Sequence, residues 1–140
     1  MKVQLLLLIT LLLNNTGCSI EQEPIHFGKD VCSYCSMTII DAGHASEIIT
    51  VKGKVYKFDS IECMIRGLNH QDDEIAEILV MDFSNPGNFI DAKTAVFIIS
   101  QDIASPMGAN LSAFKSEQAI AQKKVNGTTY NWTMIQQHIN

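Results

Sequence analysis

The chain has 140 residues, enough for one compact domain or for two very small units that share a core. Fifteen acidic and ten basic residues give a formal net charge of −5, which argues against a nucleic-acid-binding protein, because such proteins present a basic face to the phosphates. Charged residues make up 18% of the chain, a low share for a disordered protein, so we expect a folded domain.

The first seventeen residues are typical of a secretory signal peptide. Lys2 precedes a nearly all-apolar stretch over 5–13, which is too short for a membrane span of about 20 residues. A Thr-Gly-Cys sequence ending at Cys18 resembles the end of a bacterial lipobox, with Asn15 where the common pattern has Leu. This resemblance implies cleavage before Cys18 and lipidation of its thiol, which would anchor the protein to a membrane. The alternative is an ordinary signal peptide that a cysteine happens to follow.

The segment over 18–30 is polar and without periodicity, which predicts a flexible tether ahead of a folded domain over 31–140. The first half of that domain alternates short apolar runs with turn signals, and Ser60 is a suitable N-cap. The elements that we expect there are a β-hairpin over 45–58, a helix over 61–68 and a strand over 77–83.

The second half of the domain has a similar outline, with Ser116 as the second predicted N-cap. The expected elements are strands over 95–99 and 110–114, a helix from 117 to about 124 and a short helix over 132–138. The sequence therefore predicts an α+β fold of two small, related strand–strand–helix–strand (ββαβ) units, about 31–84 and 85–140.

The most informative motif is Cys-Ser-Tyr-Cys-Ser-Met at 32–37, which places three sulfurs within six residues. Cys32 and Cys35 bracket a two-residue turn that can bring both sulfurs to one ion, and an extended backbone would put Cys35 and Met37 on the same side. Soft thiolate and thioether donors favour Cu(I) over hard cations. Three alternatives stay open for the cysteine pair: a disulfide, a thioredoxin-like redox pair, and a structural zinc site, which would want a second such pair.

Two further sulfurs bear on the site. Met107 lies between Pro106 and Gly108 in a predicted tight loop, where it is less easily explained as core filler than a methionine on a helix stripe. Cys63 lies on the predicted helix over 61–68, where it is a buried thiol, a disulfide partner or a metal ligand.

In combination these motifs resemble the NosL family, lipoprotein accessory factors of nitrous-oxide reductase. The resemblance covers about 31–135 and rests on the lipobox cysteine together with four stretches: 32–37, 52–63, 89–92 and 105–114. It implies two related ββαβ units and a periplasmic Cu(I) carrier for the reductase that turns N₂O into N₂ in denitrification. The implied partners are a copper-supplying or transporter complex, a copper-enzyme recipient and the lipid membrane.

Under this resemblance, Cys35 and Met37 are the first-choice Cu(I) ligands, with Cys32 as thiolate partner and Met107 closing the site from the second unit. His44 and Cys63 are the second choices. Family members often carry Gly between the second cysteine and the methionine of the motif, where this chain has Ser.

The sequence contains no recognisable catalytic constellation, such as a nucleophile elbow, a phosphate-binding loop or a His-Glu-x-x-His motif, so we do not expect an enzyme. Two other functions stay open. One is a membrane-anchored thiol–disulfide oxidoreductase that uses the Cys-x-x-Cys pair, and the other is a structural lipoprotein whose cysteines form disulfides.

Overall fold

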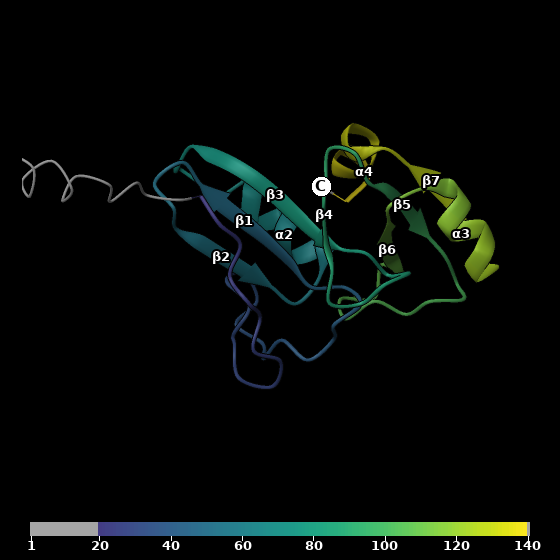
Figure 1. The fold of residues 1–140 in the computed structure, drawn as a ribbon, viewed down its shortest axis with the longest axis horizontal. Coiled ribbons are helices and arrows are strands. Elements are labelled where there is room, and N and C mark those ends of the chain that lie inside the picture. Colours follow the sequence, from purple (N-terminus) through teal and green to yellow (C-terminus); the bar gives the residue numbers. More distant parts are fainter. Residues whose placement is uncertain (1–19, 140) are drawn as a thin grey trace, which may run out of the picture.

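The structure is a computed structural model and describes residues 20–139, so the predicted signal peptide and Cys18 lie outside the described part. It has an α+β fold with two small sheets that lie side by side (Figure 1). The strands of the two sheets are β1 (Ser46–Thr50), β2 (Val55–Phe58), β3 (Ile75–Met81), β4 (Phe89–Asp91), β5 (Val96–Ile99), β6 (Leu111–Phe114) and β7 (Thr128–Tyr130). The first sheet has the strand order β2-β1-β3-β4, and the second has the order β6-β5-β7.

The predicted repeat of two ββαβ units is confirmed by the order of the elements. Helix α2 (Ile61–Leu68) connects β2 to β3, and α3 (Glu117–Lys123) connects β6 to β7, while α4 (Trp132–Ile139) ends the chain. In each sheet the first strand of the unit lies between the second and the third, and every pairing is antiparallel. The two units therefore have the same topology.

Strand β4 is an addition to this scheme that the sequence analysis did not predict. It pairs with β3 and extends the first sheet, although the division at 84/85 would assign it to the second unit. Strand β3 also ends earlier than expected, because the N–H of Phe83 donates to the carbonyl of Ala113 at 2.8 Å instead of continuing the first sheet. The exact division of the chain into units stays a prediction.

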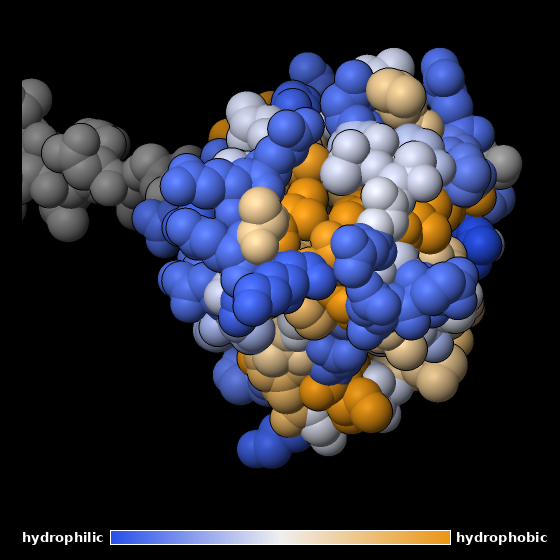
Figure 2. All heavy atoms as spheres, turned by 90° about the vertical axis from the view of Figure 1, so that its right-hand side faces the viewer, coloured by the Kyte–Doolittle hydropathy of each residue, from blue (hydrophilic) through white to orange (hydrophobic). Residues whose placement is uncertain are grey.

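One hydrophobic core joins the two units. Helix α2 buries its first five residues and contacts β6 and α4 of the second unit. A smaller cluster lies under α3, and on that side of the molecule hydrophobic residues are interspersed with hydrophilic ones (Figure 2). The shared core includes Ile39, Ile48, Phe58, Ile61, Met64, Ile65, Val80, Phe97, Leu111, Ala113 and Ile135.

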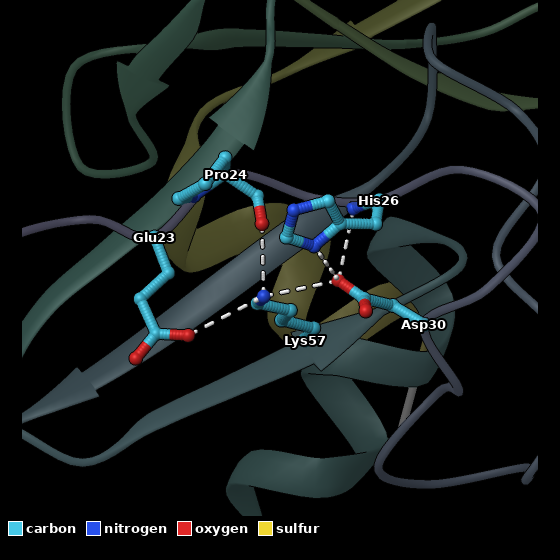
Figure 3. Close-up of polar contacts among 5 residues, drawn as sticks. All are labelled: Glu23, Pro24, His26, Asp30 and Lys57. Carbon is cyan, nitrogen blue, oxygen red and sulfur yellow. Dashed lines mark hydrogen bonds and ion pairs between the residues drawn. The ribbon is translucent and has the colours of Figure 1, made fainter.

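The segment ahead of the first sheet contacts β2 through Lys57 (Figure 3). The Lys57 ammonium donates to the carbonyl of Pro24 at 2.9 Å and to Asp30 Oδ2 at 3.0 Å, and it lies 3.3 Å from Glu23 Oε2. Asp30 Oδ2 also accepts from the N–H of His26 at 2.9 Å. The part of the predicted tether that follows Gln22 is therefore attached to the domain. Over residues 20–139 no helix is long and apolar enough to span a bilayer.

Candidate metal site

The cysteine motif lies on a short closed loop between the N-terminal segment and the first sheet. A bridge between Val31 and Thr38 closes the loop, and inside it the N–H of Cys32 donates to the carbonyl of Met37 at 2.8 Å. The N–H of Ser33 donates to the carbonyl of Lys57 at 2.8 Å, which attaches the loop to β2. Backbone hydrogen bonds thus fix the position of both cysteines.

The expectation of an extended backbone from Cys35 to Met37 is wrong. Ser36 has a φ of 63°, in the left-handed region that favours glycine, and its N–H donates to the carbonyl of Cys32 at 3.0 Å. The chain therefore turns between the two sulfurs. Cys35 is half-buried, whereas Met37 is 56% exposed at the surface.

Three thiols and one carboxylate converge at the base of this loop. The sulfurs of Cys32, Cys35 and Cys63 and a carboxylate oxygen of Asp59 all lie within 4.8 Å of one another. Asp59 lies between β2 and α2, and Cys63 lies in the first turn of α2, where its N–H donates to the N-cap oxygen of Ser60 at 3.1 Å. All three cysteines are free thiols in the structure. We call this group the thiol cluster.

The thiol cluster contains only part of the predicted ligand set. It brings together two of the first choices, Cys32 and Cys35, with the second choice, Cys63. The sequence analysis missed Asp59, whose only signal was its place between a strand end and an N-cap serine. An aspartate there is common in proteins without a metal, so the fold alone could reveal its place beside the thiols.

Hydrogen bonds and burial shift the pKa values of the three cluster thiols in different directions. A hydrogen bond from the Cys63 thiol lowers the pKa of Cys32 to about 6, and the same contact, together with burial, raises the pKa of Cys63. Burial raises the pKa of Cys35, whose thiol donates to Asp59 Oδ2 at 3.6 Å. The cluster therefore favours a thiolate at Cys32 over one at Cys63, and a thiophilic ion would displace the remaining protons.

A pocket of about 280 Å³ lies beside the cluster and between the two units. Asp59 belongs to both the pocket and the cluster. Residues from the loop of the first unit face a short segment of the second unit across this pocket. The lining residues are Met37, Thr38, Ile40, Asp41, Asp59, Ala104, Ser105 and Pro106.

The two remaining predicted ligands have different surroundings. Met107 follows directly on the pocket wall and is half-buried against the shared core, to which Cys32 and Cys63 also belong. His44 is buried elsewhere: its Nδ1 lies 2.9 Å from Asp41 Oδ2 and its Nε2 lies 3.0 Å from Ser112 Oγ. Because both ring nitrogens of His44 are engaged, the structure does not bring it to the cluster.

Comparisons with known proteins agree with the motif-based resemblance. The model of the NosL family matches residues 24–139. The copper-binding lipoprotein NosL of Stutzerimonas stutzeri is 28% identical over 130 residues, which cover 81% of this chain and 68% of that protein. The crystal structure of the copper chaperone NosL from Shewanella denitrificans superposes with a TM-score of 0.68 at 21% identity, covering 82% of this chain and 95% of that one. This likeness shows that the α+β fold is shared.

Proposed function

Because the chain belongs to the NosL family, we propose that it is a copper chaperone that binds Cu(I) at the thiol cluster. The observation that carries this proposal is the convergence of three cysteine sulfurs within 4.8 Å of one another. The names of its relatives, a copper-binding lipoprotein and a copper chaperone, support copper as the metal.

The chemistry of the donors favours the cuprous ion. Soft thiolates and thioethers prefer Cu(I), for which two or three sulfurs suffice. Cys32, Cys35 and Cys63 would hold the ion at the base of the loop. Met37 and Met107 remain proposed ligands: a neutral thioether binds Cu(I) without releasing a proton, and the exposed side chain of Met37 suits ligand exchange with a partner.

The proposed setting is the periplasmic side of a membrane. There a signal peptide over 1–17 would be removed and lipidated Cys18 would anchor the domain. The partners would be a copper-supplying or transporter complex and a recipient enzyme, a nitrous-oxide reductase or a related copper enzyme. The protein's own task would be ligand exchange rather than catalysis, in which partner donors enter the site as its own sulfurs leave.

A thiol–disulfide oxidoreductase fits the geometry less well. Within the Cys-x-x-Cys pair, the thiol with the lowered pKa, Cys32, is buried and Cys35 is half-buried, whereas a partner disulfide must reach the attacking thiolate. A structural disulfide is not formed among the three described cysteines, all of which are free.

Cu(I) titration tests the proposal. The reduced mature protein competes for Cu(I) with a chromophoric chelator under anaerobic conditions. The variants Cys35→Ser, Cys63→Ser and Met37→Leu are measured separately in the same way. Both serine variants are expected to lose affinity by about tenfold or more, since each removes a thiolate donor. Met134→Leu is the matched control for Met37→Leu, because Met134 is 50% exposed and lies on α4. Cys35→Ser and Cys63→Ser binding Cu(I) as tightly as the parent would exclude the thiol cluster as the site.

A further inference from the structure

Glu62 is a fully buried carboxylate directly beside a cysteine of the thiol cluster. Its exposed fraction is 0%, and it lies in the first turn of α2, immediately before Cys63. Its Oε1 accepts a hydrogen bond from the Ser105 hydroxyl, while Oε2 has no hydrogen-bond partner among the described residues. None of the ion pairs within residues 20–139 involves Glu62.

A buried glutamate at this position lowers the stability of the fold. Burying a carboxyl group without a full set of hydrogen bonds is unfavourable, and an apolar residue at this buried position would avoid that penalty. The single bond to Ser105 joins α2 of the first unit to a loop of the second unit, 43 residues later. Glu62 thus connects the two units through its side chain.

Ser105 begins the turn that carries Met107. The carbonyl of Ser105 accepts from the N–H of Gly108 at 3.0 Å, which closes a four-residue β-turn with Pro106 at its second position and Met107 at its third. Gly108 has a φ of 79°, which other residues rarely adopt. Because Pro106 has a fixed φ and a backbone hydrogen bond closes the turn, holding the side chain of Ser105 also holds Met107.

The same turn borders the pocket beside the cluster. Ser105 and Pro106 line that pocket opposite Met37 and Asp59, and Asp59 is itself a member of the cluster. A single side-chain hydrogen bond therefore links the neighbour of one cluster thiol to the loop that carries a thioether.

We propose that Glu62 is a positioning residue which, through Ser105, holds the Met107 turn at the copper site. The thioether of the second unit then stays within reach of an ion held by thiols of the first unit. This inference rests on the proposed Cu(I)-binding function. Glu62 does not touch the ion in this scheme, and its effect on Cu(I) passes entirely through Met107.

A double-mutant cycle tests this role. Ser105→Ala is expected to weaken Cu(I) binding by about tenfold in the parent and to have no further effect in a Met107→Leu background. Glu62→Gln keeps an oxygen that accepts from Ser105, so its Cu(I) affinity is expected to stay within about twofold of the parent. X-ray absorption of the Cu(I)-loaded protein should show one sulfur neighbour fewer in Ser105→Ala, as in Met107→Leu.

The matched control is Ser112→Ala. Ser112 is also buried, and its hydroxyl bonds a buried side chain, His44, but it lies on β6 and outside the turn. Ser112→Ala is expected to reduce the free energy of unfolding without changing Cu(I) affinity or sulfur coordination. If Ser105→Ala does not fold, Glu62→Leu makes the same comparison, because it removes the acceptor.

Three results would overturn the inference: equal losses of Cu(I) affinity from Ser105→Ala with and without Met107, no loss from Ser105→Ala at all, or a Met107→Leu variant that binds Cu(I) as tightly as the parent. In each case, Cu(I) binding that still depends on Cys35 and Cys63 would leave the proposed function standing. Failure of the reduced parent to bind Cu(I) would instead reject the proposed function.

Discussion

Glu47 offers a sharp test of the electrostatics of the first sheet. It lies on the central strand β1, is fully buried, and has no hydrogen-bond partner for either carboxylate oxygen among the described residues. Its cross-strand neighbour, Lys57, directs its ammonium to Glu23 and Asp30. Burial, the largest cause, raises the pKa of Glu47 to about 7.

The sign of the pH effect follows from this rise. The ordinary pKa of 4.5 and the folded pKa of about 7 mean that the folded protein keeps a proton that the unfolded chain releases. The contribution to stability is therefore full below pH 4.5 and is lost as the pH rises through 7. The difference is worth about 3 kcal/mol in total, of which about 2.5 kcal/mol falls between pH 5 and pH 8.

Replacing Glu47 by Gln removes this titration. Urea unfolding of the reduced, metal-free protein is measured at pH 5 and at pH 8. Between these two pH values, the free energy of unfolding of Glu47→Gln, relative to that of the parent, should rise by about 2.5 kcal/mol. The titration of other groups contributes equally to the stability of both proteins, so it cancels when the two are compared at each pH. Glu77→Gln is the control, since Glu77 is exposed on β3, and it should leave the pH dependence unchanged. If the free energies of unfolding of Glu47→Gln and the parent differ by the same amount at both pH values, the reasoning is refuted.

Three further predictions concern the scaffold of the site. Ser36→Gly should raise the free energy of unfolding by about 1 kcal/mol in urea titrations, because glycine adopts the left-handed conformation without strain; a destabilised variant would contradict this. Ser60→Ala and Ser116→Ala should each cost about 1 kcal/mol of stability as lost N-caps, but only Ser60→Ala should weaken Cu(I) binding, since that helix carries the third thiol. Lys57→Met should speed amide hydrogen exchange over 23–30 by about fivefold, and unchanged exchange there would show that this contact does not hold the segment.

The sequence predicted most of the fold because its signals are local. The N-caps Ser60 and Ser116 mark both helix starts, and the apolar runs around them mark the paired strands. Strand β4 was missed because three residues are too few to show alternation, and it exists only through its pairing with β3.

The candidate site was only partly predictable, because its geometry is non-local. The spacing of Cys32 and Cys35 indicated a shared ion, but nothing local shows that Cys63 and Asp59 meet them. That meeting depends on the loop lying against the start of α2. The turn at Ser36 was missed for a different reason, since a serine with positive φ is rare and leaves no signal in the sequence.

The attachment of the N-terminal segment to Lys57 limits how far the domain can stand from a bilayer. Under the proposed lipidation, only the chain between Cys18 and Glu23 separates the acyl chains from the first residue held by β2. Fully stretched, five residues reach about 18 Å, less than the thickness of one leaflet with its headgroups. The domain would then stay close to the headgroups, and a copper donor or acceptor would have to approach it at the membrane surface.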